Sequence, residues 1–246
     1  MIASTPDHDR EEAAEMKPTG CNSSIATATV CSTSTGTTVP PLKGSSYEKN
    51  VTITQINGSE DVAIISQVLE YDADFCPGDR RAFISEWIAP KLPPCQLPQQ
   101  EHNSRTSNSL LVQVRRRSLV ARDTSGKVVG YGSIRICANS GARIGPLFAD
   151  SPVVAERLFI GLVDISRAIF AATDAAAVTS KTSSSEATVT SSLSVAIDAP
   201  EGNLEAAALA LRFGLVASSE TVRMYRGGIP NLPVDRTYGL VCLELG

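Results

Sequence analysis

Histidine is almost absent from this chain, which has two among its 246 residues. Six cysteines, at positions 21, 31, 76, 95, 137 and 242, include no C-x-x-C pair. Because proteins bind zinc mainly through closely spaced cysteine and histidine side chains, the sequence predicts no metal site. Scattered cysteines without a disulfide framework are typical of a reducing compartment, so we expect a cytoplasmic protein.

An excess of one charge and long apolar runs are also missing. The chain has 22 basic and 26 acidic residues, a net charge of −4, which gives no electrostatic reason to expect nucleic acid or an anionic membrane as a partner. No segment approaches the ~20 apolar residues of a membrane span. The one basic cluster is Arg115-Arg116-Arg117. We favour a solvated start of a strand over a phosphate or RNA contact there, since no aromatic residues alternate with it.

Large apolar side chains are scarce in the first 46 residues, and residues 19–46 are mostly Ser, Thr, Gly and Pro. Such a segment cannot bury enough surface to offset the entropy of ordering it. We therefore expect a disordered tail over 1–46 and one folded domain over 47–246. Polar insertions are expected near 90–109 and 173–192, although residues 180–191 could instead extend a strand.

From residue 51 onward, hydrophobic periodicity predicts strands and helices in a regular order. The order is β, α, α, β, β, β, α, β, α, β, β, an α+β pattern in which an antiparallel meander precedes a strand-helix-strand unit. Strands are expected at 51–56, 118–122, 128–136, 143–148, 192–200 and around 222–225, with one more beyond. Helices are expected from about residue 61, from Asp79 through Trp87, after residue 151 and over 204–211.

Turn and cap residues support these boundaries. Asp123 to Gly126 predicts a tight turn between two strands. Asp150 or Ser151 can cap the helix that begins with Pro152, a residue tolerated in a first turn because its missing N–H is not needed there. Asn203 opens the last helix, and Gly214 provides the left-handed residue that commonly ends one.

Taken together, these motifs resemble the GNAT superfamily of acyl-CoA-dependent N-acetyltransferases. The segments 192–200, Asn203 with its helix, and 212–215 resemble the closing half of that fold. The segments 220–227, 232–239 and 243–246 are similar to the C-terminal domain of YitH/HolE-type acetyltransferases, and further matching segments fall in the same order upstream: 68–72, 78–81, Trp87, 129–132 and 144–150. The resemblance covers roughly residues 60–246. It implies a GNAT-like mixed, mostly antiparallel sheet flanked by helices.

The resemblance also implies a reaction, the transfer of an acetyl group from acetyl-CoA to a small amine. A general base for the amine should lie where the two central strands separate. Asp198, at the end of its strand, is the best placed by sequence, and Asp72, Glu220 and Asp235 are further candidates. Tyr225 or Tyr238 is expected near the thioester. The positions that the resemblance implies for holding the acetyl-CoA are Ile144, Gly145, Pro146, Leu147 and Asn203.

Two features of the superfamily are missing here. Its pyrophosphate-binding turn, [QR]-x-x-G-x-[GA], has no counterpart in 145–152, which lacks a glycine after Gly145 and places Asp150 at the helix start. The tyrosine that commonly protonates the leaving thiolate in this superfamily corresponds to Ala210. The alternative is therefore a non-catalytic GNAT-like module that completes a substrate pocket or a dimer interface. In YitH/HolE-type proteins a conventional GNAT half precedes the matched domain, so the expected partner is a second copy or a catalytic GNAT half.

Overall fold

The computed structural model describes residues 23–31, 50–58, 61–89, 116–137, 141–179, 193–225, 228 and 230–241, and for 23–31 and 172–179 it describes the backbone alone. The elements are β1 Ser23–Cys31, β2 Thr52–Ile56, α1 Val62–Asp72, the 3-10 turn η3 Ala73–Phe75, α2 Arg81–Ile88, β3 Arg116–Arg122, β4 Val128–Ile136, β5 Gly141–Ala149, α3 Pro152–Thr179, β6 Ser194–Pro200, α4 Leu204–Arg212, β7 Val216–Arg223, the 3-10 turn η5 Val234–Arg236 and β8 Thr237–Gly239.

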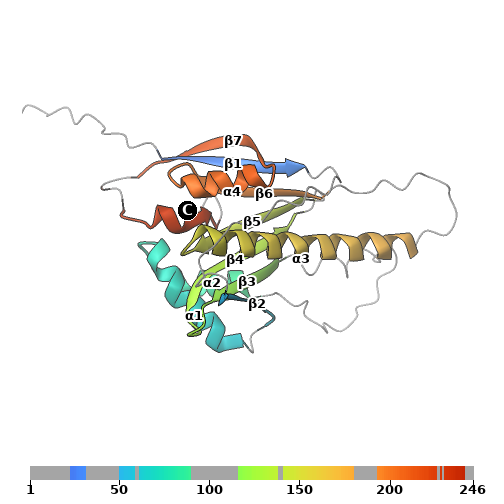
Figure 1. Ribbon diagram of the computed structural model, residues 1–246, viewed down its shortest axis with the longest axis horizontal. Coiled ribbons are helices and arrows are strands. Elements are labelled where there is room, and N and C mark those ends of the chain that lie inside the picture. The colour runs from blue at the N-terminus through green and yellow to red at the C-terminus, as the bar shows by residue number, and fades with distance from the viewer. Residues whose placement is uncertain are drawn as a thin grey trace, which may run out of the picture.

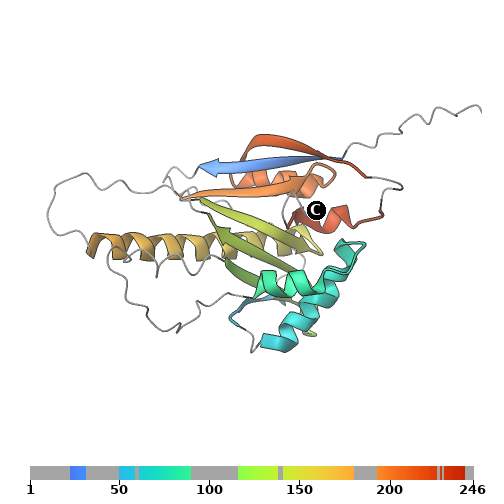
Figure 2. The same cartoon turned by 180° about the vertical axis from the view of Figure 1, so that it is seen from behind.

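In the described part of the chain, all the strands belong to one sheet with the order β2-β3-β4-β5-β6-β1-β7, and β8 pairs with β5. Neighbouring strands are antiparallel except β5 and β6, which are parallel. Helices α3 and α4 cover one face of the sheet, and α1 and α2 cover the other (Figures 1 and 2). The fold is α+β, with a mixed, mostly antiparallel sheet between two layers of helices.

From β2 onward, the order of helices and strands is the one that the sequence predicted. The tight turn is present, with the amide of Gly126 bonded to the carbonyl of Asp123 and Gly126 at φ 85°. On α3, Val154, Leu158 and Leu162 are buried and form one apolar stripe. Periodicity was a sufficient guide for this helix because it buries one face.

Three boundaries differ from expectation. Residues 23–31, expected to be disordered, form β1, because Ile25, Thr27, Thr29 and Val30 are β-branched and β6 and β7 both offer it a pairing edge. Helix α3 continues to Thr179, through the start of the expected 173–192 insertion, since its Ala-rich sequence has high helix propensity. Strand β7 begins at Val216 rather than near 222. The rest of 1–46, the insertion near 90–109 and residues 180–192 lie outside the described residues.

The core has one part on each face of the sheet. Under α3 and α4, Leu158, Leu162 and Leu209 pack against β4, β5 and β6. Under α1 and α2, Val68, Ile84 and Trp87 pack against the opposite face. Because β5 and β6 contribute to the first core, the point where these two strands separate is held rigidly from one side.

Candidate functional site

Strands β5 and β6 pair in parallel only over four residue pairs, from Gly141 with Ser194 to Ile144 with Ile197. Gly145 and then Pro146 follow in β5, and Pro146 has no N–H to donate to a ladder. Beyond it, the same edge of β5 pairs with β8 instead, with Leu147 opposite Gly239 and Phe148 opposite Thr237. We refer to residues 234–241 as the C-terminal segment, and part of it therefore lies in the gap where β5 and β6 separate.

The main chain of the C-terminal segment is bonded to β6 as well as to β5. The amide of Leu240 donates a 2.9 Å hydrogen bond to the carbonyl of Asp198. The side chains of Thr237, Tyr238, Leu240 and Val241 are all buried. The segment is thus a structural part of the sheet and of its core.

Asn203 joins α4 to the C-terminal segment. Its Oδ1 accepts from the amides of Glu205 and Ala206 at 3.0 and 3.1 Å, which caps α4. Its Nδ2 donates to the carbonyls of Asp235 and Thr237 at 3.1 and 2.8 Å. A primary amide has two acceptor and two donor positions, so Asn203 has none left for a cofactor in this arrangement.

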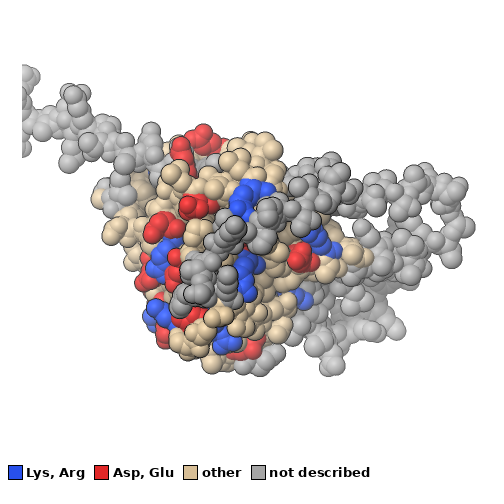
Figure 3. Space-filling view, viewed as in Figure 1, with Lys and Arg blue, Asp and Glu red and all other residues tan. Residues whose placement is uncertain are grey.

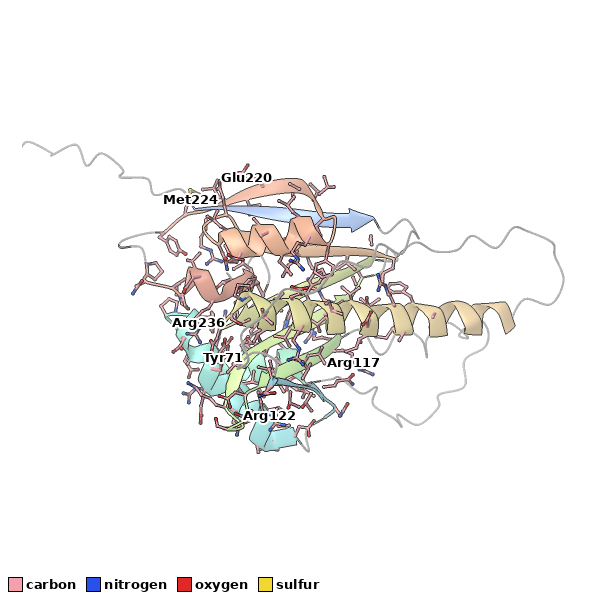
Figure 4. All side chains as sticks on the ribbon, viewed as in Figure 1. Tyr71, Arg117, Arg122, Glu220, Met224 and Arg236 are labelled. Atoms are coloured by element: carbon pink, nitrogen blue, oxygen red, sulfur yellow. The ribbon has the colours of Figure 1, made fainter. Side chains whose placement is uncertain are left out.

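A charged cluster at the start of α3 holds the same segment. The Nε of Arg236 donates to Asp150 at 2.9 Å and its Nη1 donates to Asp74 at 3.1 Å. Tyr71 donates to the same oxygen of Asp150 at 2.8 Å, and the guanidinium of Arg236 lies 5.0 Å from the ring centres of Tyr71 and Phe75. Figure 4 shows Arg236 and Tyr71 next to each other at this end of the molecule.

The charges in this cluster shift two pKa values. Burial and then the Asp150 carboxylate raise the pKa of the Tyr71 phenol, against a smaller lowering by Arg236. Burial by itself lowers the pKa of Arg236, but its contacts with Tyr71, Asp74 and Asp150 outweigh this and raise it. Arg236 therefore neutralises Asp150, the carboxylate that the sequence places at the start of α3. The cap of α3 is Ser151, whose Oγ accepts from the amide of Val154 at 3.4 Å.

The backbone positions expected to hold pantetheine are covered in this structure. Ile144, Gly145, Pro146 and Leu147 are all buried, and the carbonyl of Gly145 accepts a 3.1 Å hydrogen bond from Trp87 Nε1. A Cβ atom on Gly145 would lie 2.1 Å from the carbonyl oxygen of Leu240. A pantetheine can reach these positions only after the C-terminal segment leaves.

The three expected catalytic residues have different surroundings. Asp198 is 1% exposed and accepts a 3.0 Å hydrogen bond from Arg143 Nη2, so its carboxylate is part of an ion pair. Tyr225 is half-buried, and its hydroxyl accepts from Arg223 Nη1 at 3.3 Å. Tyr238 belongs to β8 and is buried in the core under α3 and α4. Ala210, at the position of the missing acid, is buried in the same core.

A pocket of about 150 Å³ opens beside the C-terminal segment. Its wall is mostly apolar and includes Phe75 and Phe148, whose rings stack with centres 4.0 Å apart. Arg223 and Tyr225 supply polar groups on the β7 side. The remaining lining residues are Pro200, Gly202, Leu232, Val234, Thr237 and Leu240.

A second buried polar cluster lies between α1 and β4. Asp72 is 2% exposed and accepts hydrogen bonds from Arg80 Nε and Nη2, at 2.8 and 2.9 Å, and from the hydroxyl of Tyr131. Burial and then the charge of Asp72 raise the pKa of Tyr131. Burial lowers the pKa of Arg80, but Asp72 outweighs this and raises it. The mutual pairing of these groups, closed off from solvent, indicates a structural role.

Sequence reasoning missed Arg236, Arg223 and Trp87 as residues of this region. The contacts of Arg236 are with Asp74 and Asp150, 162 and 86 positions away. No local pattern marks such distant partners. Trp87 carried one signal, since it is the only tryptophan of the chain and buried Trp N–H groups need an acceptor.

Charged side chains of both signs lie on the surface of the molecule. On the face shown in Figure 3, basic and acidic side chains are interspersed. Within the described ranges, no three His, Cys, Asp or Glu side chains gather in a way that could hold a metal ion. None of the described helices has the length and apolar character needed to cross a bilayer.

Strand β5 and the start of α3, on one side of the gap, lie in the part of the chain that has a recognisable relationship to known proteins. Residues 108–171 match the family model of an acetyltransferase (GNAT) domain. The GNAT match covers about a quarter of the chain and includes β3, β4, β5 and the first part of α3. No curated protein sequence matches the chain.

Solved structures with similarity to the chain carry GNAT or acetyltransferase descriptions. One, from Pyrococcus horikoshii and assigned as an acetyltransferase, shares 18% identity, with 91% of this chain and 52% of that chain covered and a TM-score of 0.49. A GCN5-related N-acetyltransferase from Sphaerobacter thermophilus shares 15% identity, with 82% and 50% covered and a TM-score of 0.43. The chain spans about half the length of these two proteins.

The family match thus shows that residues 108–171 are similar to an acetyltransferase (GNAT) domain. GNAT acyltransferases use acyl-CoA as the donor. In this chain, the edge of β5 that was expected from the sequence to hold acetyl-CoA is taken by the C-terminal segment.

Proposed function

We propose that this chain takes part in N-acyl transfer from acetyl-CoA to a small amine. Its role there is that of a GNAT-like module in which the cleft for acetyl-CoA, the gap between β5 and β6, is closed. The match over residues 108–171 supports the reaction class. The position of β8 between β5 and β6 supports the closed cleft. The proposal places the reaction in the cytoplasm.

The closed cleft carries the proposal because several independent contacts maintain it. The C-terminal segment is held by β5, by the carbonyl of Asp198, by Asn203 and by the Arg236 cluster. Removing it would expose the buried side chains of Tyr238, Leu240 and Val241. Each buried large apolar side chain contributes about 1.5–3 kcal/mol, so an acyl-CoA would have to replace most of this stabilisation.

The start of α3 gives a second, separate reason to propose that this chain does not hold its own acyl-CoA. The N-terminus of a helix attracts phosphate because its free N–H groups and its dipole favour negative charge. Here Asp150 lies at that position and is itself neutralised by Arg236. A pyrophosphate at this point would compete with Asp150 for Arg236 and would meet a carboxylate.

We propose a catalytic GNAT half as the partner, with the present chain completing its pocket for the amine. The chain spans about half the length of the two solved structures described above, which is compatible with a second half. A homodimer is the other arrangement that a closed module of this kind could form.

The experiment is a thermal-shift titration of the purified chain with acetyl-CoA, with desulfo-CoA and ATP as controls. We expect no saturable shift from acetyl-CoA. If acetyl-CoA binds, a concentration of a hundred times its dissociation constant would stabilise the protein by ~2.7 kcal/mol. For a domain of this size, that raises the midpoint of thermal unfolding by several degrees. A shift of that size would mean that the cleft opens and that the chain binds its own donor.

A self-sufficient acyltransferase is the second candidate, favoured because the matched region contains β5 and the start of α3, the donor side of the fold. In that case residues 234–241 must leave before the reaction, Asp198 accepts the proton of the amine, and Tyr225 or Tyr238 protonates the thiolate. Turnover of acetyl-CoA with a panel of small amines tests it. Loss of that turnover in Asp198→Asn, with acetyl-CoA binding retained, would support this candidate over the closed module.

A further inference from the structure

The pocket beside the C-terminal segment has a half-buried arginine in its wall. Arg223 lines it, and its Nη2 atom is buried and has no hydrogen-bond partner among the described residues. Its Nη1 donates to the hydroxyl of Tyr225, at 3.3 Å. Arg223 as a whole is half-buried, and an N–H that is buried without an acceptor is costly, because burial of a polar group is repaid only by hydrogen bonding.

The two polar groups of the pocket can act together on one ligand. The hydroxyl of Tyr225 accepts from Arg223, so its own hydrogen remains to be donated. A guanidinium N–H and a phenol O–H on the same wall form a pair of donors. A carboxylate, with two oxygens that only accept, complements such a pair and neutralises the charge.

The other lining residues and the volume of the pocket determine which apolar group the ligand can carry beside its carboxylate. The volume is about 150 Å³, comparable to an engineered apolar cavity that binds benzene. The stacked rings of Phe75 and Phe148 and the side chains of Leu232 and Leu240 make the wall apolar. A compact apolar group of about the size of one aromatic ring fits this space.

We propose that this pocket is a binding site for a small monocarboxylate with an apolar body, held by Arg223 and Tyr225. The ligand would enter between the end of β7 and the C-terminal segment, since Val234 and Thr237 also line the pocket. The proposal does not rest on the proposed function, because the site needs neither acetyl-CoA nor an amine.

The test is calorimetric titration of the full chain with benzoate. Benzyl alcohol and benzylamine, which have the same aromatic ring but no carboxylate, are the controls. We expect benzoate to bind at least about tenfold more tightly than either control, since a hydrogen bond to a charged group is worth that or more. Equal binding of benzoate and benzyl alcohol, or no binding of benzoate at millimolar concentration, overturns the proposal.

Variants identify the residues responsible. Arg223→Met removes the charge and keeps most of the aliphatic part of the side chain. It should lower the affinity for benzoate about tenfold or more and leave the affinity for benzyl alcohol unchanged. Tyr225→Phe should weaken benzoate less, because Arg223 remains. Arg167→Met is the matched control, an exposed arginine on α3 that pairs only at the surface, with Asp164. Unchanged benzoate affinity in a folded Arg223→Met protein rejects the site, and Arg223→Lys, which keeps the charge, provides the comparison if Arg223→Met fails to fold.

The acetyl-CoA titration described above is independent of this result. Benzoate binding with no acetyl-CoA binding is the outcome expected from both proposals. Acetyl-CoA binding without benzoate binding rejects both of them.

Discussion

The amide of Leu240 donates a hydrogen bond to the carbonyl of Asp198, 42 residues earlier in the chain. This bond connects β6 to the C-terminal segment at the point where β6 has separated from β5. The backbone of Asp198, expected from the sequence to be a catalytic residue, therefore supports the segment that closes the cleft. Its carboxylate is meanwhile paired with Arg143.

Asn203→Ala should release the C-terminal segment and weaken α4. Loss of an N-cap costs about 1 kcal/mol, and the two hydrogen bonds from Nδ2 contribute about 1 kcal/mol each. We expect the free energy of unfolding to fall by about 2–3 kcal/mol in urea denaturation.

Asn203→Asp separates the two roles of this residue. It keeps the capping oxygen but replaces the two donors by an oxygen that faces the carbonyls of Asp235 and Thr237. Cleavage near the C-terminal segment in limited proteolysis should increase in this variant. Asn57→Asp, at an exposed position, is the control and should leave the pattern of fragments unchanged.

Gly145→Ala should be strongly destabilising. The new methyl group would lie 2.1 Å from the oxygen of Leu240 and 3.1 Å from that of Val241, and backbone atoms cannot move aside as a flexible side chain can. We expect a loss of about 3 kcal/mol or more, at the upper end of what overpacking causes. Gly78→Ala is the control, because no atom lies within 4 Å of its Cβ position. Equal stability of the two variants would show that the segment is not in the gap in solution.

The single tryptophan reports on the same region. Trp87 Nε1 is bonded to the carbonyl of Gly145, and the guanidinium of Arg116 lies 4.2 Å from the ring centre. Displacement of the C-terminal segment by Gly145→Ala should therefore shift the Trp87 emission to longer wavelength. An emission spectrum identical to that of the unchanged protein would argue that Gly145→Ala leaves the surroundings of Trp87 intact.

Arg236→Met should cost about 1 kcal/mol of stability. The ion pairs with Asp74 and Asp150 are partly exposed, and such pairs contribute little individually, but the stacking on Tyr71 and Phe75 adds a cation–π contribution. The loss should shrink as salt is raised, because partly exposed charges are screened. Arg167→Met, which breaks only a surface pair, should cost less than about 0.5 kcal/mol. Equal losses in both variants would mean that the cluster does not hold the segment.

Stability should fall in alkali because of Tyr131. Its pKa in the folded protein is raised by burial and by Asp72, whereas an unfolded tyrosine titrates near ~10. The unfolded chain therefore loses this proton first, so the stabilisation is complete below pH ~10 and is lost as pH rises above it. Each such group contributes a slope of up to ~1.4 kcal/mol per pH unit.

Tyr131→Phe removes that contribution. Urea denaturation between pH 9 and 11.5 should give a shallower fall in stability for the variant, together with a loss of about 1.5–3 kcal/mol at neutral pH from the missing hydrogen bond to a charged group. The same slope in both proteins would show that Tyr131 titrates alike in the folded and unfolded states.

Much of the fold was predictable because its elements carry local signals. The stripe of Val154, Leu158 and Leu162, the cap at Asn203 and the turn at Gly126 each specify an element within a few residues. The strand β1 was not predicted, since its Ser and Thr content was interpreted as disorder although the same residues suit a strand. Local composition does not say whether two distant strands will offer an edge.

The site was less predictable for a related reason. Thr237-Tyr238-Gly239 is a plausible strand, but nothing within these residues indicates that their partner is Leu147 and Phe148 of β5. The β5 residues expected to hold a cofactor lie where β5 and β6 separate, and the structure surrounds them with the C-terminal segment and Trp87. Pairing across such distances depends on the assembled sheet, as does the burial of Arg223 Nη2 without a hydrogen-bond partner.

The position of β8 also has a consequence for synthesis on the ribosome. Strands β5 and β6 emerge well before residues 237–241, so a nascent chain that already contains both has an unpaired edge on β5 in the middle of its sheet. Exposed strand edges of this kind invite pairing with other chains, and contacts of long sequence separation form slowly. Strand β8, made after β5 and β6, thus covers this edge at the centre of the sheet, so whether a newly made molecule folds or aggregates depends on these few residues.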